Sequence, residues 1–211
     1  LTVMLLVDVS GSRNFGTLSQ MKRDMMAEVA ATLAFSTIAN NDKVGVIFFS
    51  DKIEKYIPAQ KGKTHVLHII RELLSFEPNS KGTDMAQALQ YFANAQKRHC
   101  TAFLISDFIG AGAVDKPLLI ASNRHEVNAI QIYDRREAEL PNIGLVKFHD
   151  AESDKDLWID TSLATVRDDY AQAWKQNQDL LEQLFTRTGV NHISVRTDED
   201  YVKALMHLFR C

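Results

Sequence analysis

The 211-residue chain contains few cysteines and few residues that interrupt secondary structure: two cysteines, nine glycines and four prolines. Cys100 and Cys211 are too few for a disulfide framework or a cysteine-rich zinc site. Because disulfides are rare in reducing compartments and common outside them, this scarcity favours a cytoplasmic protein.

An excess of one charge and a long apolar run are also missing. The formal net charge is −3, so we expect no nucleic-acid partner. The apolar residues that end at Val7 meet Asp8 too soon to span a bilayer, and the start lacks the basic leader and cleavage site of a signal peptide. The chain opens without Met, inside a predicted strand. We therefore expect a fragment of a longer chain whose N-terminal part, with any membrane anchor, lies outside this sequence.

The residues that are present are typical of a soluble globular domain, with 45% hydrophobic and 24% charged side chains. Strand and helix patterns alternate, which predicts a three-layer α/β/α fold around a mostly parallel sheet with one antiparallel edge strand. We predict strands at 2–7, 43–49, 52–59, 101–106, 127–133 and 192–196, and helices at 18–38, 64–76, 84–98, 117–124, 170–188 and 198–210.

One stretch departs from this alternation. Residues 143–149 and 157–160 resemble two strands joined by a polar tip, which predicts a β-hairpin inserted at about 143–161, between the fifth strand and the long helix. Gly189 is placed to end that helix. Because we find no repeat and no linker, we expect residues 1–211 to form a single domain.

The segment with the clearest chemistry follows the first strand. Asp8 comes directly after the apolar run, and Ser10 and Ser12 follow at alternate positions in a turn that contains Gly11. Ligands bind parallel α/β sheets at the carboxyl ends of strands, near a switch in strand order. Carboxylate and hydroxyl oxygens favour Mg²⁺, Mn²⁺ or Ca²⁺ over zinc, so we predict a site for such a cation.

Two later loops offer matching oxygens. Thr83 precedes a predicted helix, and Asp107 follows the strand at 101–106. Each has an ordinary structural explanation by itself, because Thr83 can cap its helix and Asp107 can close a turn. Three such loops on one alternating scaffold nevertheless predict that their side chains meet at one edge.

The pattern Asp8-x-Ser10-x-Ser12, then Thr83, then Asp107 resembles the metal-ion-dependent adhesion site of von Willebrand factor A domains. More narrowly, the chain resembles the bacterial branch known as domain of unknown function 58. That closer resemblance rests on residues 139–145, Asp160-Thr161 with Arg167 and Tyr170, residues 197–202, and the closing Leu208-Phe209-Arg210.

The resemblance implies that Ser10, Ser12 and Thr83 supply hydroxyls, and that Asp8 and Asp107 supply carboxylates, directly or through water. Mg²⁺ takes about six ligands, so a position remains for a Glu or Asp of a partner protein. Such recognition makes and breaks no bond, and we therefore expect no enzymatic activity. Members of this branch are commonly encoded beside AAA+ ATPases of the MoxR type, which suggests such an ATPase as the partner by analogy.

Other kinds of site fit the sequence less well. A Mg²⁺-dependent phosphatase of the haloacid dehalogenase type is the alternative function, but it needs a second acid where this chain has Ser10. The segment Gly62-Lys63-Thr64 lacks the earlier glycine of a phosphate-binding loop, and neither serine near Gly11 lies in a nucleophile elbow. His65 and His68 have no further His or Cys cluster beside them and are expected at the surface or core edge.

Apolar residues flank the predicted metal site. Phe15 follows the first loop, and Phe108 and Ile109 follow Asp107, close to several glycines. Beside Arg13, which stands where such domains often have Met, these three side chains form a predicted partner-binding rim. The alternative is that Phe15 and Phe108 fold inward and support the loops.

Overall fold

The computed structural model describes residues 1–10, 22–80, 82–110, 112–150 and 155–208. Its central sheet has six strands in the order β3-β2-β1-β4-β5-β8, of which only β3 runs antiparallel to its neighbour. The predicted mostly parallel sheet with one antiparallel edge strand is therefore confirmed. The strand bounds are β1 (Thr2–Asp8), β2 (Lys43–Phe49), β3 (Ile53–Gln60), β4 (Thr101–Ser106), β5 (Glu126–Tyr133) and β8 (Asn191–Arg196).

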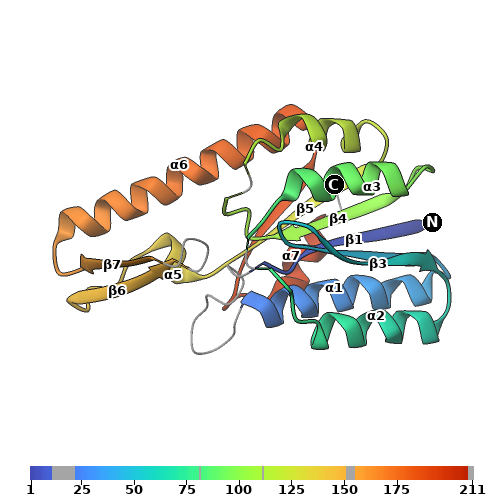
Figure 1. Cartoon of the computed structure of the whole chain (residues 1–211), viewed down its shortest axis with the longest axis horizontal. Coiled ribbons are helices and arrows are strands. Elements are labelled where there is room, and N and C mark those ends of the chain that lie inside the picture. Colours follow the sequence, from blue (N-terminus) through green and yellow to red (C-terminus); the bar gives the residue numbers. More distant parts are fainter. Residues whose placement is uncertain (11–21, 81, 111, 151–154, 209–211) are drawn as a thin grey trace.

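Helices cover both faces of this sheet, which explains why its central strands are apolar at nearly every position (Figure 1). Leu5 and Val7 of β1 join the core on one face, and Met4 and Leu6 join the core on the other. The first face is covered by α1 (Lys22–Ala39), α2 (Lys63–Ser75) and α7 (Tyr201–Leu208). The second is covered by α3 (Met85–Ala95), α4 (Asp115–Ser122) and the C-terminal part of α6 (Ala164–Thr188).

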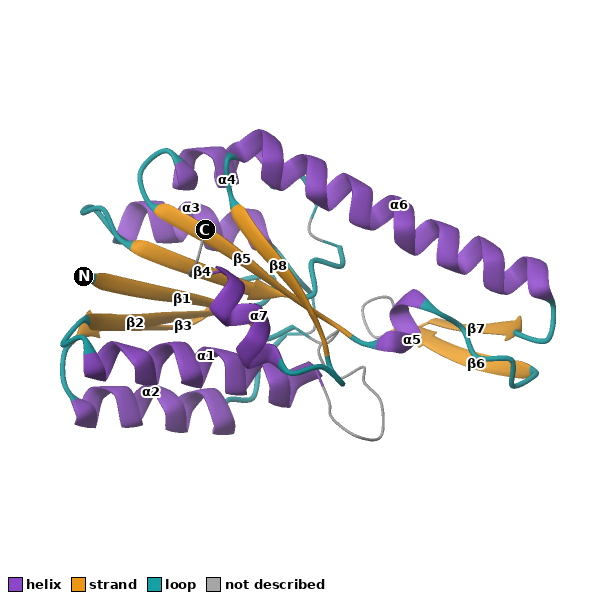
Figure 2. Ribbon diagram, turned by 180° about the vertical axis from the view of Figure 1, so that it is seen from behind, coloured by secondary structure: helices purple, strands orange, loops and turns teal. Residues whose placement is uncertain are grey.

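The segment between β5 and β8 extends away from this body as an arm (Figures 1 and 2). The arm consists of the short helix α5 (Arg135–Ala138), the antiparallel strands β6 (Leu145–Asp150) and β7 (Lys155–Asp160), and the first half of α6. The buried residues of α6 all lie in its last eight positions, beginning with Leu181. The first half of that helix therefore contributes no buried residue, and its Trp174 contacts the body at Tyr133, where β5 ends, with ring centroids 5.2 Å apart.

Most predicted elements agree with the structure within a few residues, and the predicted hairpin is confirmed. Several boundaries were wrong. Helix α6 begins at Ala164 rather than near Tyr170, α7 begins at Tyr201 rather than Asp198, α3 ends at Ala95 rather than Arg98, and Pro117 is the third residue of α4 rather than its first. Helix α5 was not predicted from the sequence. Residues 18–21 of the first predicted helix and 209–210 of the last lie outside the described residues.

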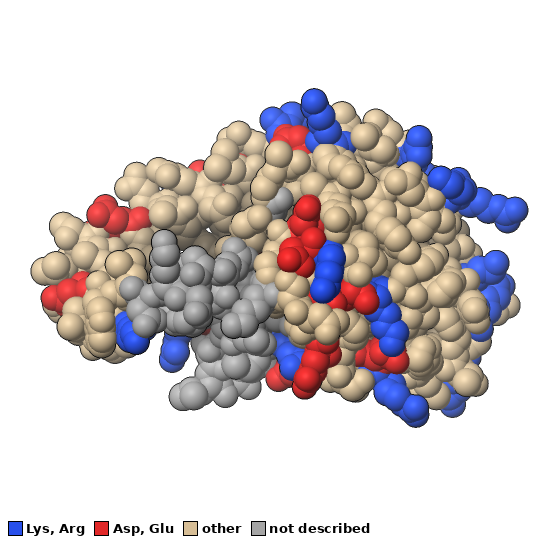
Figure 3. Space-filling model, viewed as in Figure 1, with Lys and Arg blue, Asp and Glu red and all other residues tan. Residues whose placement is uncertain are grey.

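On the face shown in Figure 3, basic and acidic side chains are interspersed over the body. None of the described helices combines the length and the apolar character needed to cross a bilayer.

Candidate metal site

Asp8 and Asp107 lie where two neighbouring strands end. Asp8 is the last residue of β1, and Asp107 follows the last residue of β4. The order of the sheet reverses between β1 and β4, since β2 and β3 lie on one side and β5 and β8 on the other. This is the switch point at which the carboxyl edge of a parallel sheet offers a ligand site, and the sequence places both carboxylates there.

The carboxylate of Asp8 is buried and held on both oxygens. The backbone N–H of Ser10 donates to Oδ1 at 2.9 Å, and the Ser106 hydroxyl donates to Oδ2 at 2.6 Å. The same Ser106 oxygen accepts the backbone N–H of Phe108 at 3.0 Å. Ser106 therefore connects the two loops of the switch point. From the sequence, Ser106 was predicted only as the last residue of the strand at 101–106.

Two negative groups share this buried edge. Asp8 and Asp107 are each 1% exposed. Burial, and after it the nearby charge of Asp107, raise the pKa of Asp8 to about 6, although the hydrogen bonds from Ser106 and Ser10 act in the opposite direction. A cation at this edge would favour the ionised form of Asp8, which burial and the charge of Asp107 disfavour.

Thr83 does not cap the helix that follows it. The N-cap of α3 is Asp84, whose side chain accepts the backbone N–H of Gln87 at 2.9 Å. The Asp84 N–H donates to the Ser50 carbonyl at 2.8 Å, which fixes the loop at the end of β2, beside β1. The Thr83 hydroxyl oxygen is buried and has no hydrogen-bond partner in the described part of the chain. A buried hydroxyl without a partner is costly unless something fills the place.

The residue that sequence reasoning missed is Lys22, the first described residue of α1. Its side chain is fully buried, and its ammonium donates to Asp107 Oδ2 at 2.7 Å and to Glu137 Oε1. Burial lowers the pKa of Lys22, but the carboxylates of Asp107 and Glu137 outweigh it and the net pKa is raised. Lys22 is therefore an ammonium ion inside the protein.

Glu137 connects this group to the base of the arm. Its second oxygen accepts the Asp134 backbone N–H at 2.9 Å, and the Asp134 side chain accepts the Arg136 N–H, which together form the capping box of α5. The Asp134 side chain also accepts the hydroxyl of Thr197, after β8. Side chains of α1 and α5, and of the residues that follow β4 and β8, are thus joined in one hydrogen-bonded group that includes Asp107.

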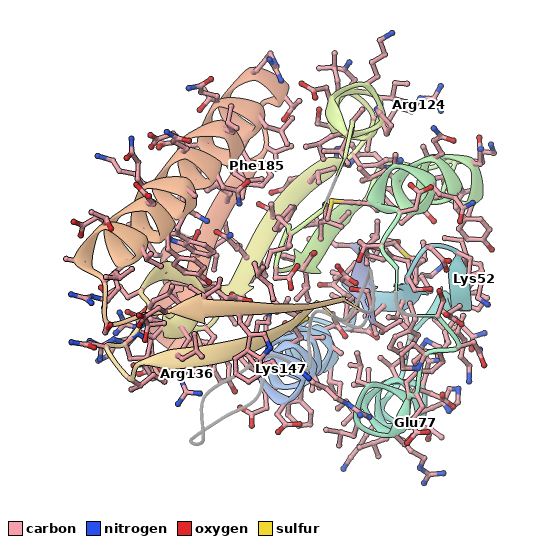
Figure 4. All side chains as sticks on the ribbon, turned by 60° about the vertical axis from the view of Figure 1, so that its left-hand side comes forward. Lys52, Glu77, Arg124, Arg136, Lys147 and Phe185 are labelled. Carbon is pink, nitrogen blue, oxygen red and sulfur yellow. The ribbon has the colours of Figure 1, made fainter. Side chains whose placement is uncertain are left out.

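The other predicted site residues differ in outcome. Ser12 and Phe15 lie outside the described residues. Phe108 is 3% exposed and packs edge-on against Phe185 at 5.3 Å, so its side chain does not belong to a partner-binding rim. Its φ of 58° turns the backbone so that the ring enters the core beside α6, where Figure 4 labels Phe185. Ile109 is 36% exposed and remains available at the surface.

The oxygen atoms at this edge suit a hard divalent cation. The candidate ligands are two carboxylates and hydroxyls, a set that Mg²⁺, Mn²⁺ and Ca²⁺ prefer. Within the described ranges, no three His, Cys, Asp or Glu side chains are grouped so that they could hold a metal ion, so a cation here would depend on hydroxyl ligands beside the two carboxylates. His65 instead bonds the Val44 carbonyl at 2.8 Å, and His68 lies beside Glu72 on α2.

The raised pKa of Asp8 predicts a dependence of stability on pH. A raised folded-state pKa gives a contribution that is complete below about pH 3.8 and is lost as the pH rises through 6. In chelator at pH 7.5, we expect Asp8→Asn to raise the free energy of unfolding by about 1–3 kcal/mol, because the amide removes the buried charge. Urea unfolding at pH 7.5 and pH 4 measures this effect. A gain of the same size at both values would contradict it.

Comparison with known proteins gives a family and a fold. The family described as "Protein of unknown function DUF58" matches residues 1–180. An uncharacterized protein of Mycobacterium tuberculosis is 32% identical over 206 residues, which is 96% of this chain and 64% of that protein. The chain thus spans less than two thirds of the length of that relative.

Two solved structures share the fold at low sequence identity. The conserved hypothetical protein BatB of Bacteroides thetaiotaomicron superposes with a TM-score of 0.65 at 15% identity, covering all of this chain and 97% of that one. The VWA domain of SpRpn10 superposes with a TM-score of 0.51 at 11% identity, covering 97% and 93%. The three-layer α/β/α architecture of the von Willebrand A type is therefore shown.

Proposed function

The chain belongs to the DUF58 family, and on that premise we propose that it is a non-catalytic module that binds another protein through a divalent cation. Asp8, Ser10, Thr83 and Asp107 would hold the cation, together with Ser12. The cation would supply positive charge to which a Glu or Asp of the partner binds. Mg²⁺ is the expected metal, with Mn²⁺ or Ca²⁺ as substitutes.

The observation that carries the proposal is the Thr83 hydroxyl. It is a buried oxygen without a hydrogen-bond partner in the described residues, and its loop is fixed beside the strand that ends in Asp8. Asp84 fulfils the capping role that would otherwise explain a threonine there. A metal ligand explains why a hydroxyl is kept at this position without a partner.

The arm offers contact area for the partner in place of Phe108. Three apolar side chains of its strands β6 and β7 are more than half exposed: Leu145 at 64%, Leu157 at 61% and Trp158 at 60%. Trp158 is paired across the hairpin with Lys147, which Figure 4 labels on the arm. With Ile109 and Phe15, we propose that these residues bind the partner beside the cation.

A pull-down from the source cell tests this function. We expect the immobilised chain to retain a protein partner in Mg²⁺ and to release it in chelator, and Asp8→Ala to retain none. An AAA+ ATPase of the MoxR type is the partner that the family resemblance suggests. Retention that is equal in Mg²⁺ and chelator would contradict metal dependence, and turnover of generic phosphate esters would support the phosphatase alternative instead.

Replacement of the unpartnered hydroxyl gives a sharper test. We expect Thr83→Val to weaken Mn²⁺ binding by about tenfold or more, because it removes an oxygen and leaves the shape of the side chain almost unchanged. Thr83→Ser keeps the oxygen and should bind within about threefold of the wild type. Calorimetric titration measures both, and equal affinities for valine and serine would exclude Thr83 as a ligand.

A further inference from the structure

The buried edge holds more acids than bases. Among the described residues, the buried acids are Asp8, Asp107, Asp134 and Glu137, whereas Lys22 is the only buried lysine or arginine. Lys22 does not divide its charge evenly among them: its ammonium contacts Asp107 and Glu137. Asp8 is held instead by uncharged donors, among them the Ser10 N–H and the Ser106 hydroxyl.

This arrangement gives the two candidate carboxylate ligands different roles. One oxygen of Asp107 accepts the Lys22 ammonium at 2.7 Å, and the other accepts the Ile109 N–H at 3.0 Å. Asp107 and Glu137 thus share one ammonium, which offsets part of the Asp107 charge within the protein. A cation at the switch point would meet the reduced charge of Asp107 and the full charge of Asp8, which no described cation contacts directly.

We propose that Lys22 is a positioning residue that takes up the charge of Asp107, so that the site binds the free metal weakly and leaves the bound metal short of negative charge. This inference rests on the proposed function, and it adds a reason why the site would prefer a partner that bears a carboxylate. A divalent cation with one uncompensated carboxylate keeps net positive charge, which favours an acidic group from outside. The internal ammonium therefore selects for a carboxylate-bearing partner at the expense of affinity for the metal alone.

The two substitutions Lys22→Met and Glu137→Gln separate this role from simple support of the fold. Lys22→Met alone leaves two buried carboxylates without their cation and is expected to fold poorly. The double variant Lys22→Met/Glu137→Gln keeps the net charge of the wild type and nearly the same side-chain volumes. We expect it to bind Mn²⁺ at least about tenfold more tightly, because Asp107 becomes available to the metal.

Glu137→Gln alone should have the opposite effect. With glutamine at 137, Lys22 has Asp107 as its one remaining carboxylate contact among those described here, and we expect Mn²⁺ to bind about threefold or more weakly. The matched control is Lys55→Met/Glu72→Gln, which removes another lysine–glutamate ion pair, joined at 2.7 Å between β3 and α2. That variant should bind Mn²⁺ as the wild type does.

Calorimetric titration with Mn²⁺, supported by the Mn²⁺-induced rise in melting temperature, measures the affinity of four proteins. These are the wild type, the double variant at 22 and 137, Glu137→Gln, and the control variant at 55 and 72. Tighter binding by the Lys22→Met/Glu137→Gln variant and weaker binding by Glu137→Gln support the inference. If the wild type binds and the double variant binds equally or more weakly, the inference is overturned while the proposed function stands. If none of the four binds, the proposed function fails and the role of Lys22 fails with it.

Discussion

Asp8→Ala should lower the affinity for Mg²⁺ or Mn²⁺ by more than about 100-fold. Loss of a residue that only supports a metal ligand typically lowers metal affinity by about 10- to 100-fold, and loss of a ligand should lower it further. Asp8 is the carboxylate at the switch point that contacts neutral donors only. Its removal takes away the main negative charge available to a cation. Isothermal calorimetry on the chelator-treated protein measures the loss.

Asp24→Ala is a control that changes the net charge by the same amount. Asp24 is exposed in the first turn of α1, two residues after Lys22, and it is not a candidate ligand. We expect Asp24→Ala to bind the metal within about twofold of the wild type. If Asp8→Ala remains folded and binds as tightly as Asp24→Ala, the assignment of Asp8 is wrong.

Deletion of residues 198–211 should destabilise the domain by about 3–6 kcal/mol, a large share of the stability of an ordinary domain. Leu205 and Leu208 of α7 are 4% and 6% exposed and belong to the core on the α1 face of the sheet. Each buried leucine contributes about 1.5–3 kcal/mol, and the deletion also exposes the residues beneath them. Urea unfolding of the full and shortened chains gives the difference.

Point substitutions on the same helix separate packing from chain length. Leu205→Ala should cost about 2–5 kcal/mol, as other buried leucines do. Met206, the next residue of α7, is 52% exposed, and Met206→Ala should change stability by less than about 0.5 kcal/mol. Equal effects of the two substitutions, or a shortened chain that unfolds with the full chain, would show that α7 does not support the core.

The architecture was predictable because the sheet is buried on both faces. Apolar runs such as Val44–Phe49 are typical of a central strand, and Pro58, which has no N–H to donate to a neighbouring strand, indicates that β3 lies at the edge. Residues 164–169 at the start of α6 were missed for the converse reason. None of them is buried, so they carry no apolar period from which a helix can be predicted.

The candidate site was predictable only in part. Strand-end acids and hydroxyls are visible in the sequence, because they interrupt apolar runs at Asp8 and Asp107. Lys22 gave no such signal, since a lysine near the start of a helix is ordinarily solvated. Its burial depends on Glu137, 115 residues later, within a four-residue helix too short to have a pattern of its own. The direction of the Phe108 ring likewise depends on a positive φ that the sequence does not disclose.

The position of the cation can be measured directly by adding Mn²⁺ to the isotope-labelled chain and following the paramagnetic broadening of backbone amide signals. We expect the signals of residues 8–10, 83–84 and 106–109 to broaden first, while Asn41, Arg98 and Glu126 at the opposite edge of the sheet stay sharp. Broadening confined to the acidic hairpin tip at 150–156, or broadening spread evenly over the molecule, would contradict a metal site at the switch point.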